Sequence, residues 1–136
     1  EVISVAALDR DGDVWSGSSL GGELDSSGEE RQDPHKKPEI AAPGVDIIST
    51  AFDDEYYSST GTSDSTVFVS GILALILEAE PRLKNPDSSC IFEVKTALMN
   101  SAMPLEDGKT HDSRWGYGAI NGENWLEEIR LTGSCL

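Results

Sequence analysis

The chain has 136 residues, the length of one modest domain, and its 25 acidic and 10 basic residues give a formal net charge of −15. Such acidity repels polyphosphate, so the composition argues against nucleic acid as a partner. No apolar run approaches the roughly 20 residues that cross a bilayer, so we expect no membrane span. The two cysteines, Cys90 and Cys135, lack metal-ligand spacing. They could form a disulfide, but two free thiols are slightly favoured.

The first part of the chain predicts one strand and two polar segments. Residues 2–8 are almost continuously apolar and predict a strand covered on both faces, as in parallel sheets. The carboxylates of Asp9–Asp13 follow in a turn that we expect to be solvated, because Leu20 stands where the closing glutamate of an EF-hand loop belongs. Residues 21–37 have no apolar period and predict a surface loop.

A hairpin is predicted next. Residues 40–42 form a short strand that Pro43-Gly44 ends in a turn. Two further strands, 45–50 and 56–59, flank an acidic tip and predict the hairpin. It leads to Gly61, whose missing side chain permits a tight bend.

The first of three predicted helices runs from Asp64 to about Glu80 and is apolar almost all round, which predicts a position in the middle of a domain. Pro81 ends it. If half of the domain lies outside this chain, one flank of residues 67–77 is expected to stay uncovered and to promote aggregation.

Two shorter helices complete the chain and, with the strands, predict an α/β layered fold. Ser89 caps the second helix and Asn121 the third. Helical spacing predicts the buried stripes Ile91, Val94, Leu98 and Trp125, Leu126, Ile129.

Ser63 stands where the bend meets the first helix. The first N–H groups of a helix lack internal partners and lie at the positive end of its dipole, so they stabilise an oxyanion. A serine hydroxyl there could attack a carbonyl while its own N–H receives the developing charge. A helix-starting serine is also an ordinary cap, so position alone decides nothing. The loop residues His35 and His111 are poor candidates for its base.

Five blocks of the chain resemble segments of the subtilisin-like serine proteases, the subtilases, in that family's order. Gly61-Thr62-Ser63 with Val69-Ser70-Gly71 resembles the nucleophile segment. The other blocks are residues 2–9, 15–21, 37–50 with its Ala42-Pro43-Gly44, and 116–121. The resemblance implies a three-layer α/β fold with a mainly parallel sheet and helices on both faces. Residues 1–136 would be the C-terminal part of the catalytic domain, with a loop insertion at 21–37. The sedolisins share Gly-Thr-Ser but match the Ala-Pro-Gly block less well.

The resemblance implies a serine endopeptidase in which Ser63 forms an acyl-enzyme and its backbone N–H is one oxyanion donor. The family's aspartate, histidine and oxyanion asparagine would precede residue 1, so we expect a missing N-terminal part to supply them and the segment alone to be inactive. Polypeptides are the expected substrates, and the chemistry requires no cofactor. Subtilases often bind structural calcium, although no metal ligand is assigned here. The family resemblance also implies an extracellular or secreted protein.

The sequence departs from the family beside the nucleophile. Subtilases usually continue with a Met-Ala-x-Pro-His-Val-like run, whereas Asp64–Val69 stands here. The charge of Asp64 would oppose a developing oxyanion unless it points to solvent. A catalytically impaired, protease-like binding scaffold is therefore the alternative function.

Overall fold

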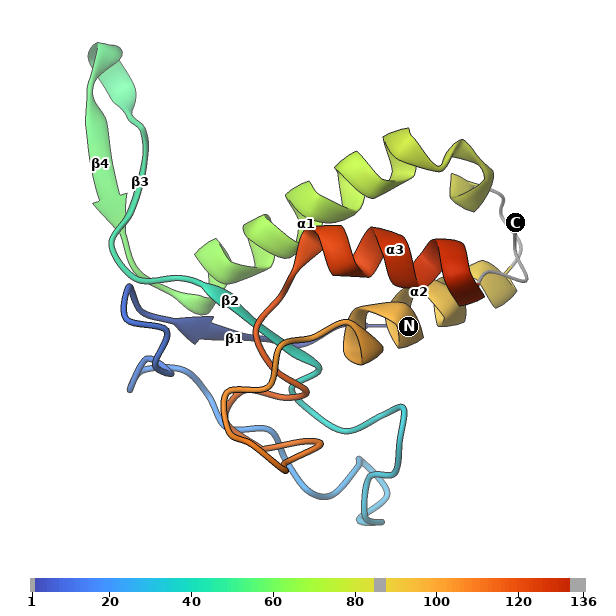
Figure 1. Cartoon of the computed structure of the whole chain (residues 1–136). Coiled ribbons are helices and arrows are strands. Elements are labelled where there is room, and N and C mark those ends of the chain that lie inside the picture. Colours follow the sequence, from blue (N-terminus) through green and yellow to red (C-terminus); the bar gives the residue numbers. More distant parts are fainter. Residues whose placement is uncertain (1, 85–87, 133–136) are drawn as a thin grey trace.

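The computed structural model describes residues 2–84 and 88–132, which form a small α/β arrangement (Figure 1). In chain order the elements are β1 (Val5–Leu8), β2 (Ile40–Pro43), β3 (Ile47–Thr50), a 3₁₀ turn (Phe52–Asp54), β4 (Tyr56–Ser59), α1 (Thr62–Ala79), a second 3₁₀ turn (Pro81–Lys84), α2 (Ser88–Asn100) and α3 (Gly122–Thr132). The predicted α/β class is confirmed, and the elements lie within a few residues of their predicted bounds.

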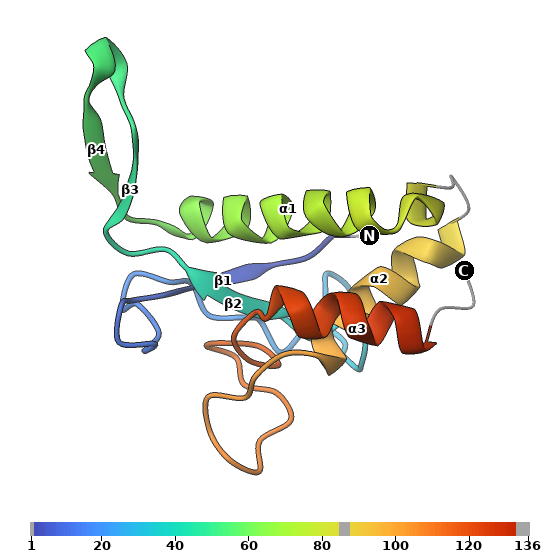
Figure 2. The ribbon, with the colours of Figure 1, turned by 45° about the horizontal axis from the view of Figure 1, so that its top comes forward.

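Strands β1 and β2 pair in parallel, with Val5 opposite Ile40 and Ala7 opposite Ala42. Successive side chains of a strand point to opposite faces. Ile40 and Ala42 therefore belong to the core shared with the helices, whereas Ala41 packs on the other face with Trp115. Figure 2 shows α1 running over the strand pair; α3 contacts α1, and α2 packs against α3.

A buried carboxylate anchors the start of β2. Glu39 is fully buried, and its Oε2 accepts a hydrogen bond from the Ser4 backbone N–H at 2.7 Å. Lys37 forms an ion pair with the same carboxylate, and Lys95 of α2 approaches its Oε1 to 2.8 Å. This arrangement joins the chain before β1, the end of the 21–37 loop and α2.

The block at residues 116–121 runs beside β2. The Ala41 N–H donates to the Gly118 carbonyl at 2.9 Å, and the Ile120 N–H donates to the Ala41 carbonyl at 2.8 Å. Gly116 has a φ of +72°, and a Cβ there would lie 2.5 Å from the Glu39 carbonyl group. Only glycine fits this approach.

Helix α1 has one uncovered flank. Of its residues only Ser65, Val69 and Ile76 are buried, whereas Val67 and Leu75 are 69% and 72% exposed. The predicted central position is therefore wrong for this chain, and the uncovered flank expected for an incomplete domain is present. By length and composition α1 could cross a membrane, but core helices of soluble proteins pass the same test, so the absence of a span stays a prediction.

Two other expectations are wrong. Ile91 is 53% exposed, because α2 buries its neighbour Cys90 together with Ala97 and Leu98. Cys90 is disulfide-bonded, contrary to the slight preference for free thiols, and Cys135 lies outside the described residues. In α3 the prediction is confirmed, since Trp125 and Ile129 are buried and the Asn121 side chain accepts a hydrogen bond from the Asn124 N–H at 3.0 Å.

Candidate functional site

Ser63 is the second residue of α1 and its side chain is exposed. Its N–H belongs to the first helical turn and has no carbonyl partner within the helix. The next two N–H groups, of Asp64 and Ser65, both donate to the Gly61 carbonyl, at 3.1 Å and 3.4 Å. The hydroxyl and the N–H of Ser63 thus lie together at the positive end of the helix dipole, where a developing oxyanion would be stabilised.

Gly44, rather than Gly61, is the glycine that this geometry requires. Gly61 is extended, with φ 170° and ψ 162°, and a Cβ there would approach nothing closer than 3.6 Å. A Cβ on Gly44 would lie 2.2 Å from the Ser65 Oγ and 2.7 Å from the Gly61 carbonyl oxygen. The predicted bend at Gly61 is present, but neither the backbone angles nor the space around this residue requires glycine.

Gly44 also links three segments that are distant in sequence. Its N–H donates to the Leu8 carbonyl at 2.9 Å, and its carbonyl accepts from the Gly61 N–H at 2.8 Å. The end of β1, the turn after β2 and the residue before α1 are thereby held together. The Ala-Pro-Gly and Gly-Thr-Ser blocks are therefore in direct contact in the structure.

Two side chains beside Ser63 are unusual. Ser65 is fully buried, and its Oγ has no hydrogen-bond partner among the described residues. Asp64 turns back toward the hairpin, where its Oδ2 accepts a hydrogen bond from the Ser59 Oγ at 2.9 Å. The carboxylate is thus engaged with the last residue of β4, on the side of the bend.

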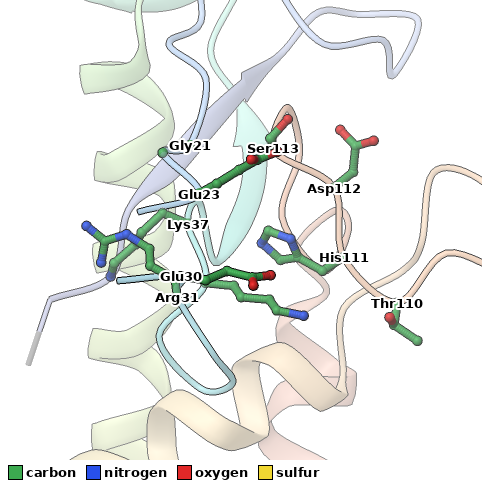
Figure 3. Close-up of a pocket in the computed structure, with 11 residues that line it drawn as sticks. Gly21, Glu23, Glu30, Arg31, Lys37, Thr110, His111, Asp112 and Ser113 are labelled. Carbon is green, nitrogen blue, oxygen red and sulfur yellow. The ribbon is translucent and has the colours of Figure 1, made fainter. Parts of the chain in front are cut away.

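His111 lies in a different place, a polar pocket of about 300 Å³ formed by the 21–37 loop and residues 110–113. Glu30 and His111 point toward each other across this pocket, whereas Thr110 points away (Figure 3). The His111 Nε2 lies 2.9 Å from the Pro38 carbonyl oxygen. Because a carbonyl oxygen can only accept, this nitrogen carries the hydrogen and donates the hydrogen bond. No residue of α1 lines the pocket.

The neighbouring Asp112 is held ionised by its surroundings. Burial raises the pKa of Asp112, but hydrogen bonds from Arg114 and Lys109 outweigh burial and hold that pKa below its ordinary value. His35 is exposed on the loop. The structure brings neither histidine to Ser63, and in the described part of the chain no group of three or more histidine, cysteine or carboxylate side chains could hold a metal ion.

Comparison with known proteins agrees with this geometry. The family model described as "Subtilase family" matches residues 1–118, which include β1, the hairpin and α1. The chain belongs to the subtilase family. Serine protease AprX of Bacillus subtilis is 33% identical over 138 residues, covering 91% of this chain and 29% of that protein. C5a peptidase of Streptococcus pyogenes is 38% identical over 98 residues, covering 67% of this chain and 8% of that protein.

Solved protease structures match nearly the whole chain. The prenylagaramide maturation protease PagA matches with a TM-score of 0.68 and 29% identity, over 94% of this chain and 42% of that one. The CspB protease of Clostridium perfringens shares the fold, with a TM-score of 0.74 and 24% identity, over 98% of this chain and 27% of that one. The chain therefore spans less than half of each of these relatives.

Proposed function

We propose that the complete polypeptide is a serine endopeptidase that hydrolyses peptide bonds through an acyl-enzyme on Ser63. The observation that supports this proposal is the exposed Ser63 hydroxyl at the first turn of α1, in a chain of the subtilase family. The Ser63 Oγ would attack the peptide carbonyl, and the Ser63 N–H would be one donor to the resulting oxyanion.

The proposed chemistry needs a base that this chain does not bring to Ser63. A serine hydroxyl is a weak nucleophile at neutral pH without a histidine to remove its proton. We propose that a preceding part of the same catalytic domain supplies the histidine, its aspartate and a second oxyanion donor, an asparagine. The same part would cover the apolar flank of α1, where Val67 and Leu75 are exposed. The 136-residue chain alone is then inactive.

The remaining expectations follow from the family. The substrates are polypeptides, the chemistry requires no cofactor, and structural calcium would bind elsewhere in the complete protein. The protein would be secreted or extracellular, like many subtilases.

A catalytically impaired binding scaffold is the second candidate, and Asp64 is the observation that favours it. A negative charge one residue from the nucleophile would oppose oxyanion formation. The hydrogen bond from Ser59 to the Asp64 Oδ2 favours activity instead, because it directs the carboxylate toward β4.

Covalent labelling of the full-length polypeptide with a fluorophosphonate distinguishes the two candidates. We expect labelling of the wild type and none of the Ser63→Ala variant. Labelling confined to an Asp64→Asn variant would identify the impaired scaffold. If neither the wild type nor Asp64→Asn is labelled, the endopeptidase proposal is wrong. Peptide turnover by residues 1–136 alone would refute the proposed division of the catalytic groups.

A further inference from the structure

The β3–β4 hairpin projects away from the rest of the molecule (Figures 1 and 2). Several of its apolar side chains are exposed. Ile48 is 69% exposed, Phe52 86% and Tyr56 73%. Exposed apolar surface of this kind commonly marks a site of interaction. The α/β core does not require these side chains, since none of them belongs to either buried cluster.

The pairing of the hairpin places Ile48 and Tyr56 on one face, whereas Tyr57, which is 53% exposed, lies on the opposite face. Ile48 pairs with Ser58, and Thr50 pairs with Tyr56. Paired residues lie on the same face of a sheet, and residues two apart along a strand share it. Ile48, Thr50, Tyr56 and Ser58 therefore form one surface of apolar groups and hydroxyls.

The outer edges of the hairpin are open. Within the described residues β3 and β4 form a sheet of two strands, so each strand pairs on one side only. Unpaired N–H and C=O groups on such an edge can accept an extended peptide as an additional strand. The hairpin thus offers main-chain hydrogen bonds as well as an apolar surface.

The charge of this region is of one sign. Residues 46–64 contain five carboxylates, at Asp46, Asp53, Asp54, Glu55 and Asp64, and no lysine, arginine or histidine. Clustered charge of one sign attracts partners of the opposite sign and repels like-charged ones. The matching occupant is an extended segment that carries lysine or arginine among apolar residues.

The hairpin is joined closely to the nucleophile. The Ser59 Oγ donates to the Asp64 Oδ2 at 2.9 Å, and the Asp46 N–H donates to the Thr60 Oγ1 at 2.9 Å. Strand β4 has four residues and therefore extends about 13 Å. A peptide lying along it would engage the acidic tip several residues away from the bond that Ser63 attacks.

We propose that the β3–β4 hairpin is a docking surface for basic, extended segments of the polypeptide substrate. This inference rests on the proposed endopeptidase function and adds to it the substrate class. Lysine or arginine several positions from the cleaved bond pairs with Asp53, Asp54 and Glu55, and apolar residues between them pack on Ile48 and Tyr56.

Peptide binding to the full-length polypeptide with the Ser63→Ala substitution tests the inference without turnover. The probe is a fluorescein-labelled peptide of alternating lysine and leucine, compared by anisotropy with a peptide in which glutamate replaces lysine. We expect the lysine peptide to bind at least about tenfold more tightly, with the advantage falling as salt is added. Equal affinities would overturn the inference.

A charge-matched pair of triple variants locates the binding surface. Asp53→Asn, Asp54→Asn and Glu55→Gln together neutralise the tip, and asparagine tolerates the positive φ of 57° and 61° at residues 53 and 54. We expect about tenfold weaker binding of the lysine peptide, since each exposed pair contributes a small increment. The control removes the same charge at exposed positions elsewhere, with Asp11→Asn, Glu29→Gln and Asp107→Asn. Equal losses in the two triple variants would refute the assigned location.

Two further measurements separate the remaining outcomes. If Ser63 is labelled by the fluorophosphonate but the lysine and glutamate peptides bind equally, this inference is refuted and the endopeptidase proposal still holds. Lysine-peptide binding that depends on the tip, without labelling, would refute the endopeptidase proposal and leave the hairpin as a surface that binds basic peptides without cleaving them. Dimerisation abolished by Tyr56→Ser, in the absence of peptide binding, would identify a second copy as the occupant and refute the inference.

Discussion

Replacing Gly44 with alanine tests whether this residue holds the nucleophile segment in place. The new Cβ would lie 2.2 Å from the Ser65 Oγ, 2.7 Å from the Gly61 carbonyl oxygen and 2.9 Å from the Ala7 Cβ. Real Cβ atoms do not approach other heavy atoms so closely, and the Gly61 oxygen belongs to the backbone. The chain must therefore shift. Overpacking of this kind costs about 1–3 kcal/mol, and because three contacts are too close at once, the expected loss is about 3 kcal/mol.

Urea unfolding of the chain at low protein concentration, followed by circular dichroism, measures this loss. A lower midpoint at an unchanged slope reports a change in stability. Gly22→Ala is the matched control, because a Cβ there meets only the Leu24 carbonyl oxygen at 3.6 Å and should change stability by less than about 0.5 kcal/mol. If Gly44→Ala unfolds at the same midpoint as Gly22→Ala, the argument for close approach fails.

Ser65→Ala provides a second arm of the same experiment. The substitution removes a buried hydroxyl that has no hydrogen-bond partner among the described residues, so it should stabilise the chain by about 1 kcal/mol. It also removes the closest contact of the new Cβ in Gly44→Ala. The double variant should therefore be more stable than the sum of the two single effects predicts. Strict additivity would show that residues 44 and 65 do not meet.

Three other substitutions test separate parts of the structure. Gly71→Ala should stabilise this chain by up to about 1 kcal/mol, because its Cβ would meet nothing within 4 Å, but should destabilise the full-length polypeptide if another segment covers α1. A change in stability of the same sign in both polypeptides would refute the proposed covering of α1. The midpoints of urea unfolding measure the two changes. Glu39→Gln removes the buried carboxylate that Lys37 and Lys95 share, and should cost about 3–5 kcal/mol in the same assay. Glu80→Gln tests pH dependence. Hydrogen bonds from arginine side chains hold the pKa of Glu80 below its ordinary 4.5, so its contribution is full above that pH and is lost as pH falls through the lowered pKa. The stability difference between wild type and Glu80→Gln should close on acidification below pH 4.5, and a difference independent of pH would contradict it.

Local sequence patterns predicted much of the fold. Apolar runs, turn residues and helical spacing placed β2, β4 and α3 close to their observed positions, because these signals depend on residues near each other in the chain. The cap at Asn121 is of this kind, since its acceptor serves a backbone N–H three residues later. The order of the sequence blocks also predicted the family, which the family model over residues 1–118 confirms.

The misassigned features depend on distant neighbours. Gly61 precedes the helix, but the glycine without space for a side chain is Gly44, because Ser65 and Ala7 meet there from other parts of the chain. Spacing put Ile91 on a buried stripe, although the stripe that α2 buries contains Cys90 and Ala97. A one-dimensional pattern cannot say which face of a helix meets a partner.

By itself, then, the sequence determined the α/β class, the family and the identity of Ser63 as the candidate nucleophile, since these follow from local chemistry and from ordered blocks. The tertiary structure alone decided that Gly44 packs closely against the bend before α1 and that the Asp64 carboxylate turns to Ser59. It also decided that one flank of α1 and both faces of the hairpin carry exposed apolar side chains. Each of these depends on which segments, far apart in the chain, pack against one another and which find no partner in the described residues.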